Sequence, residues 1–348
     1  MREILEIQKQ LLPDLMEILK KRYTILHQIM LSDVIGRRTL AASLDMTERV
    51  LRAETDLLKA QGLIEIESVG MRISDAGRRL LEQIEPVVGE LFGLTNLEER
   101  IRNYFGLKQV IIVPGDWDTS PHTKRELGRA GCRALRKVMT KDDVIAVTGG
   151  STLAQMAEQL TTSTPLKGNW FVPARGGLGE SLDYQANTIA STMAKRTGAQ
   201  YRLLHVPDQM SEEAYQSLSQ EPNIQEVVKA IRQARIVVHG IGDAFVMARR
   251  RRVDDKTVEA IRQRGALAEA LGYYFDTQGR VVHRTPTLGL RLEDVMKTEV
   301  VIAIAGGKSK GRSIAAVLRF GHEDILVTDE AAAHEILKYM DGAERGDA

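Results

Sequence analysis

A glycine pair followed by two hydroxyl residues offers the chemistry of a phosphate site. Gly149, Gly150, Ser151 and Thr152 follow the apolar run Val144–Val147, with one residue, Thr148, in between. This order predicts a strand, a tight turn and the start of a helix, because glycines let the backbone bend sharply. Free amide hydrogens and the helix dipole favour an anion at such a turn. The G-x-x-x-x-G-K spacing of a Walker loop is absent, and an ordinary strand–helix turn stays the alternative.

Three basic segments could bring positive charge to the same place. Each comes directly after an apolar run, where the ligand-facing loops of parallel sheets lie. A single basic run more often marks a solvated surface. Three of them together with the glycine turn predict an anion site that a ligand with two phosphates would use best. The segments carry Arg175, the run Arg249–Arg252, and the group Lys308, Lys310 and Arg312.

Short β-rich runs alternate with amphipathic stretches from about residue 90 onward, and these elements must position the basic groups. Such alternation predicts an α/β domain in which helices flank a parallel, Rossmann-like sheet. The predicted strands are Gln109–Val113, Val144–Val147, Trp170–Val172, Tyr201–Val206, Ile236–Val238, Val300–Ile304 and Ile325–Val327. The predicted helices are Lys124–Met139, Thr152–Leu160, Ile224–Ala234 and Gly311–Leu318.

The N-terminal part carries a helix–turn–helix pattern between residues 37 and 64. Thr47 can cap the second helix by accepting amide hydrogens of its first turn. Residues 63–73 alternate like a small hairpin with Gly70 at its turn, and Ser74 is expected to cap a helix that runs to Pro86. Seven-residue spacing predicts one buried face on the second helix. Its members are Val50, Leu51, Leu57 and Leu58.

The opposite face of that second helix has the side chains that a reader of the major groove needs. An arginine can bond O6 and N7 of guanine together, and basic residues at the ends of the motif suit phosphate contacts. Nearby acidic residues dilute the charge, so a solvated helix face or a protein-interaction module stays an alternative. With the hairpin that follows, the pattern predicts a winged helix–turn–helix. The candidate DNA-binding residues are Arg37, Arg38, Thr47, Arg49 and Arg52.

Length and composition set the outer bounds. The chain has 348 residues and a formal net charge of +1, so we expect two domains, 1–88 and 89–348, without a global basic signature. Cys132 is the single cysteine and is expected to be a buried helical residue. The seven histidines lack metal-ligand spacing, and no apolar run is long enough to cross a membrane. These features predict a cytoplasmic protein without a metal or cofactor.

Six segments together resemble the SorC-type family of sugar-responsive bacterial repressors. They are the winged helix and the sequences VTGGST, PARGGLGE, GIGDAF, YYFDTQGRVV and AIAGGKSK, which cover nearly the whole chain. The resemblance implies an effector domain similar to glucosamine-6-phosphate deaminase and the ribose-phosphate isomerases. It also implies repression of glycolytic genes and an effector that is a phosphorylated sugar, fructose 1,6-bisphosphate.

The resemblance further implies a role for ten residues at the effector site. Gly149, Gly150, Ser151 and Thr152 would hold one phosphate, with Lys310 nearby. Arg175, Gln185, Arg250 and Arg251 would meet the ligand, and Glu269 would accept sugar hydroxyls.

The comparison with the deaminases also bears on catalysis. Those enzymes carry a histidine after their G-x-G turn, whereas the sequence Gly240–Phe245 has Ala244 and Phe245 at that place. Without an acid–base imidazole there, we predict a regulator rather than an enzyme. A sugar-phosphate isomerase or deaminase fused to a DNA-binding domain is the alternative. Since helix–turn–helix proteins commonly bind DNA as dimers, we expect a homodimer or homotetramer.

Overall fold

A computed structural model describes residues 11–32, 34–84, 88–177, 181–208, 210–251 and 253–344. Contacts between Cα atoms divide the chain into two compact units. The first holds the chain up to Asn96 together with Ser120–His122, and the second holds Leu97–Thr119 and the chain from Thr123 onward. The division at residue 88 that the sequence suggested stays a prediction.

The first unit has the helix–turn–helix and hairpin order that the sequence predicted. Its apolar core is built around Leu40, Leu51, Leu58, Ile64 and Met71. The elements in order are α2 (Pro13–Leu31), α3 (Arg37–Ser43), α4 (Glu48–Ala60), β1 (Ile64–Glu67), β2 (Gly70–Ile73), α5 (Asp75–Ile84) and α6 (Val88–Leu91). The next helix, α7, spans Leu94–Phe105.

Two details of the first unit correct the sequence analysis. The buried stripe of α4 is narrower than predicted: Leu51 and Leu58 are buried, but Val50 and Leu57 are 44% and 36% exposed. Each residue of an α-helix is rotated by about 100° from the one before it, so Val50 and Leu57, next to the buried Leu51 and Leu58, fall outside a contact this small. The hairpin turns before Gly70, which already pairs with Glu67 as the first residue of β2. Helix α5 ends at Ile84, and Pro86 lies outside the described residues.

The second unit is built on a parallel sheet of seven strands in the order β3-β13-β12-β7-β4-β5-β6. Six of the seven match the predicted runs closely. The strands are β3 (Gln109–Val113), β4 (Val144–Val147), β5 (Trp170–Pro173), β6 (Gln200–Tyr201), β7 (Ile236–His239), β12 (Val300–Ile304) and β13 (Ile325–Asp329). The strand predicted over Tyr201–Val206 is wrong beyond Tyr201. Its neighbour β5 ends at Pro173, which has no N–H with which to continue the ladder.

Helices cover both faces of this sheet, and two apolar clusters lie between the layers. One cluster joins alternate strand residues such as Val147 and Val238 to α8, α9 and α10. The other joins Ala146 and Val237 to α12 and α15. Cys132 is buried on α8, as predicted. The helices are α8 (Pro121–Val138), α9 (Ser151–Gln159), α10 (Ala186–Thr197), α11 (Glu212–Ser219), α12 (Pro222–Arg232), α15 (Leu292–Val295), α16 (Gly311–Phe320) and α17 (Glu330–Glu344).

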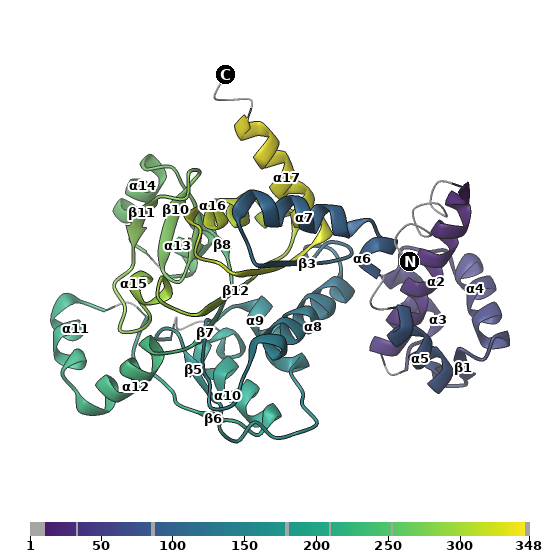
Figure 1. Cartoon of the computed structure of the whole chain (residues 1–348), viewed down its shortest axis with the longest axis horizontal. Coiled ribbons are helices and arrows are strands. Elements are labelled where there is room, and N and C mark those ends of the chain that lie inside the picture. The colour runs from purple at the N-terminus through teal and green to yellow at the C-terminus, as the bar shows by residue number, and fades with distance from the viewer. Residues whose placement is uncertain are drawn as a thin grey trace. The chain divides into compact units, whose positions relative to one another are not determined.

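A second, antiparallel sheet of four strands was not anticipated from the sequence. Its order is β11-β10-β9-β8, and Figure 1 shows it in one cluster with the green helices α13 and α14. Ser313 of α16 donates its hydroxyl to the carbonyl of Leu267 in β9, which ties this sheet to helix α16. The elements are β8 (Gly242–Asp243), α13 (Ala244–Arg250), α14 (Asp255–Gln263), β9 (Ala266–Ala270), β10 (Tyr273–Asp276) and β11 (Val281–Arg284).

None of the helices in the described ranges is both long and apolar enough to cross a bilayer.

Candidate functional site

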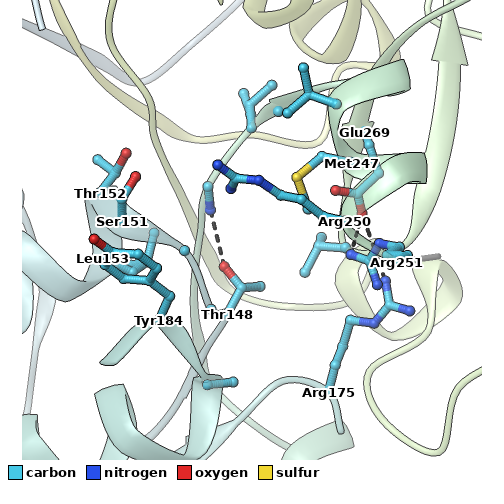
Figure 2. Close-up of a pocket in the computed structure, with 18 of the residues that line it drawn as sticks. Thr148, Ser151, Thr152, Leu153, Arg175, Tyr184, Met247, Arg250, Arg251 and Glu269 are labelled. Carbon is cyan, nitrogen blue, oxygen red and sulfur yellow. Dashed lines mark hydrogen bonds and ion pairs between the residues drawn. The ribbon is translucent and has the colours of Figure 1, made fainter. Parts of the chain in front are cut away.

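A cavity of about 520 Å³ opens at the carboxyl ends of β4, β5, β7 and β12. All ten residues that the resemblance implied line it, although they come from six separate segments of the chain. They are Gly149, Gly150, Ser151, Thr152, Arg175, Gln185, Arg250, Arg251, Glu269 and Lys310. Figure 2 shows Ser151 and Thr152 on one side of the cavity, and Arg175, Arg251 and Glu269 on the other. The cavity is within the size range of small-molecule sites.

The glycine turn presents the N-terminus of α9 to this cavity. Gly150 has a φ of 119°, a conformation open to glycine but strained for other residues. No side chain of the described residues caps the helix. The Gly150 N–H donates to the carbonyl of Tyr184, whereas the amides of Ser151, Thr152 and Leu153 have no acceptor among the described residues. An anion at this turn would meet those amides and the positive end of the helix dipole.

Lys310 reaches the cavity from the loop after β12. Two carboxylates hold that loop by accepting its backbone N–H groups. The N–H of Gly307 donates to Asp329 at 2.7 Å, and the N–H of Ser309 donates to Asp118 at 2.9 Å. Burial lowers the pKa of the Lys310 ammonium, and the nearby charge of Arg250 lowers it further. Within the described ranges no carboxylate comes within ion-pair distance of its Nζ. An anionic ligand would therefore give this ammonium a direct ion-pair partner, in addition to the more distant Asp118 and Asp329.

Arg175 and Arg251 line the opposite side, but both are already paired. Arg175 Nε lies 2.9 Å from an Asp208 carboxylate oxygen, and Arg251 contacts the other oxygen of Asp208. Arg251 Nη2 also donates to Glu269 at 2.9 Å. Burial lowers the pKa of Arg175. For Arg251 burial acts in the same direction, but the attraction of Glu269 and Asp208 outweighs it and raises the pKa.

We call these four side chains, Arg175, Asp208, Arg251 and Glu269, the charged quartet. Its two positive and two negative charges balance. Arg175 and Arg251, which were expected to bring positive charge to the site, therefore each face a carboxylate that the sequence did not pair with them, and their contact with a ligand stays a prediction.

Several lining residues were missed from the sequence. Thr148 accepts the N–H of Gly240 at 3.1 Å and so joins the loops after β4 and β7 (Figure 2). Asp243 caps α13 by accepting the amides of Phe245 and Val246. Thr148 and Asp243 belong to the quoted motifs VTGGST and GIGDAF, so their position after a strand was a signal. Asp208 belongs to no quoted motif, although it comes two residues after the strand predicted over Tyr201–Val206, and its tertiary contacts reveal its place in the site. Arg252 and residues 178–180 of PARGGLGE lie outside the described residues.

The predicted DNA-reading face is exposed on α4. Thr47 caps this helix by accepting the N–H of Val50. Arg52 lies 3.9 Å from Asp56 on the same face, and Arg38 is 3.3 Å from Glu48. Such exposed pairs are weak, so DNA phosphates or bases could displace the acidic partners.

No group of three or more His, Cys, Asp or Glu residues that could hold a metal ion occurs in the described part of the chain. His239 is fully buried beside the cavity, and burial lowers its pKa to about 4. It is therefore neutral at physiological pH.

Comparison with known proteins relates both units to one class of regulator. The family described as "CggR N-terminal DNA binding domain" matches residues 18–88, and the one described as "Putative sugar-binding domain" matches residues 89–338. A central glycolytic genes regulator from Priestia megaterium is 47% identical over 339 residues, which cover 97% of this chain and 99% of that protein. This chain belongs to the SorC family, among the central glycolytic genes regulators. The regulator of that name from Bacillus subtilis is 43% identical, with the same coverage of 97% and 99%.

Solved structures of the family agree with the fold. The "putative SorC family transcriptional regulator" from Enterococcus faecalis is 43% identical, with a TM-score of 0.66 over 70% of this chain and 99% of that one. The full-length sorbitol operon regulator SorC from Klebsiella pneumoniae, at 16% identity, has a TM-score of 0.63 over 92% of this chain and 99% of that one. That second likeness concerns the fold alone.

These comparisons confirm three predictions: the SorC-type family, an N-terminal DNA-binding domain before an α/β sugar-binding domain, and a transcriptional regulator rather than an enzyme. The more specific similarity to glucosamine-6-phosphate deaminase and the ribose-phosphate isomerases stays a prediction.

Proposed function

We propose that this chain represses glycolytic genes by binding operator DNA, and that fructose 1,6-bisphosphate is the effector that modulates this binding. The proposal is carried by one observation: the uncapped N-terminus of α9 and the ammonium of Lys310 face the same 520 Å³ cavity. One phosphate would lie against Gly149–Thr152, within reach of Lys310. Arg250, whose charge acts on Lys310, would meet the second phosphate, and Arg175, Gln185 and Glu269 line the part of the cavity where the sugar would lie.

The effector can change DNA affinity only by as much as it prefers one state of the protein over another, with coupling of typically 1–3 kcal/mol. A helix–turn–helix reader engages paired half-sites, so we propose a homodimer or homotetramer in the cytoplasm as the active form. In that form the bisphosphate would weaken or remodel operator binding. By reciprocity, operator DNA would change the affinity for the bisphosphate by the same factor.

Lys310 and Lys308 provide a matched test on the same loop. Lys310 lines the cavity, whereas Lys308 is exposed and does not. In the full-length protein, Lys310→Met should weaken fructose 1,6-bisphosphate binding at least tenfold by calorimetry, and Lys308→Met should leave it unchanged. Both variants should keep the affinity of the ligand-free protein for operator DNA.

Thermal stability gives a second readout. At 100 times Kd the bisphosphate should stabilise the wild-type protein by about 2.7 kcal/mol. The proposal fails if no sugar phosphate alters operator binding in a gel-shift titration. It fails equally if Lys308→Met weakens binding as much as Lys310→Met does.

A further inference from the structure

The charged quartet brings four segments together at one side of the cavity. Arg175 follows β5, Asp208 precedes α11, Arg251 follows α13, and Glu269 belongs to β9. Each of these side chains is at most 6% exposed. The backbone of Asp208 is fixed as well, because its N–H donates to the carbonyl of Gly177 at 2.9 Å. The quartet is thus a preformed, electrically balanced wall of the site.

This wall has hydrogen-bonding capacity that the described residues do not use. The carboxylate of Glu269 is engaged, since one oxygen accepts from Arg251 and from the N–H of Gly272 at 2.6 Å. By contrast, Oδ1 of Asp208, Nε of Arg251 and all three guanidinium nitrogens of Arg175 are buried without a hydrogen-bond partner in the described part of the chain. Arg175 Nε is close enough to Asp208 for an ion pair, but its N–H does not point at that oxygen. Buried polar groups of this kind normally find partners.

An open anionic acceptor beside open donors matches a hydroxyl group better than a phosphate. A hydroxyl can donate to Asp208 and accept from Arg175 at once. A phosphate can only accept, and its charge would be repelled by Asp208 at close range. The other side of the cavity has the opposite character, because Lys310 and the α9 N-terminus offer donors and positive charge.

We infer that Asp208 is a specificity-determining residue that reads the hydroxyl groups of the effector, so that the site selects a phosphorylated polyol over an anion of equal charge without hydroxyls. This inference rests on the proposed function. It assigns the phosphates to the glycine turn, Lys310 and Arg250, and the hydroxyl groups of the sugar to Asp208.

Two ligands with the same phosphates separate hydroxyl recognition from charge. Fructose 1,6-bisphosphate carries hydroxyls between its two phosphates, and hexane-1,6-diyl bisphosphate carries none. Calorimetry on the full-length wild-type protein should show at least tenfold tighter binding of the sugar. Asp208→Asn removes the anionic acceptor at nearly constant shape. It should weaken sugar binding about tenfold and leave the hexane compound unchanged or bound more tightly, since a negative charge has gone.

Two further variants serve as controls for this comparison. Asp183→Asn removes an exposed carboxylate outside the quartet and should change neither affinity. Should Asp208→Asn alone fold poorly, the double variant Asp208→Asn with Arg251→Gln keeps the quartet neutral and should show the same loss of selectivity.

The inference is overturned if Asp208→Asn weakens both ligands by the same factor, which would make Asp208 only a support for the arginines. It is also overturned if selectivity for the sugar persists in Asp208→Asn and in the double variant Asp208→Asn with Arg251→Gln. A wild-type protein that bound neither ligand would refute the proposed function itself, and this inference with it, which is a distinct result.

Discussion

The backbone N–H of Gly150 donates to the carbonyl oxygen of Tyr184 at 2.8 Å, so the glycine turn and the segment before α10 are joined directly. The contact is close because Gly149 has no side chain: a Cβ there would lie 2.5 Å from that same carbonyl oxygen. Tyr184 and the following Gln185 both line the cavity. The shape of the site therefore depends on a glycine at position 149.

Replacing Gly149 by alanine should push the Tyr184–Gln185 segment away from the turn. We expect bisphosphate binding to fall at least tenfold and stability to fall by about 1–3 kcal/mol, as for other overpacked sites. Calorimetry and urea unfolding measure the two effects. Gly240→Ala is the matched control, because its Cβ would meet its nearest neighbour, Leu153, at an ordinary 3.4 Å. Equal losses in both variants would contradict this account.

Asp329 holds the loop that carries Lys310. One carboxylate oxygen accepts the N–H groups of Trp117 and Gly307, both at 2.7 Å, and the other accepts the N–H of Ala332 at 2.8 Å. In Asp329→Asn an amide NH₂ must face a backbone N–H. We expect the free energy of unfolding in urea to fall by about 2–4 kcal/mol, since buried donors lose their acceptor. The exposed control Glu293→Gln should change it by less than about 0.5 kcal/mol, and a similarly small change for Asp329→Asn would refute the assignment.

A buried pair, His239 and Glu323, should leave a signature in the pH dependence of stability. Their Nε2 and Oε1 atoms are 3.6 Å apart. Burial lowers the pKa of His239 from 6.5 to about 4 and raises that of Glu323 from 4.5 to about 7. For His239 the unfolded state binds more protons, so its contribution to stability rises between pH 4 and 6.5. For Glu323 the folded state binds more protons, so its contribution falls between pH 4.5 and 7.

These two slopes oppose each other between pH 4.5 and 6.5 in the wild-type protein. Glu323→Gln removes one of them. The free energy of unfolding of the second unit should then rise with pH more steeply than in the wild type, by about 1.4 kcal/mol per pH unit in this window. Urea unfolding at several pH values between 4.5 and 6.5 measures the difference. Parallel curves for variant and wild type would show that Glu323 does not titrate as described.

The exposed arginines of α4 should determine which DNA sequence is preferred. Arg49→Ala and Arg52→Ala together should remove about 1–3 kcal/mol of discrimination per base pair that each arginine reads. The measurement is the ratio of affinities for operator and scrambled DNA at fixed salt. Arg38→Ala is the contrasting variant, since the loss of a phosphate contact should weaken binding to operator and scrambled DNA alike. If the double variant keeps the wild-type ratio, α4 is not the reading helix.

The sequence by itself determined the features that depend on local hydrogen bonds and periodicity. Apolar runs predicted six of the seven parallel strands, because a strand buried on both faces is apolar along its whole length. Thr47 predicted the start of α4, and Ser74 predicted the start of α5, where its hydroxyl accepts the N–H of Gly77 at 3.0 Å. The glycine turn was predictable for the same reason, since a strand, two glycines and two hydroxyl residues specify it within a few positions. Arg175, Lys310 and the run Arg249–Arg252 stood out as basic groups after apolar runs, and the resemblance to the SorC-type family added Gln185 and Glu269.

Only the tertiary structure decided which charges meet. Asp208 and Glu269 come from segments with no regular spacing to Arg175 and Arg251, so no periodicity could pair them, and the arginines looked available to the ligand. The antiparallel sheet that carries Glu269 was also missed, because its strands are short and give a weak local pattern. The narrow buried stripe of α4 depends on how much of that helix its neighbours cover. In the charged quartet and around α4 the deciding contacts join residues far apart in the chain, and their energy arises only when the fold brings those residues together.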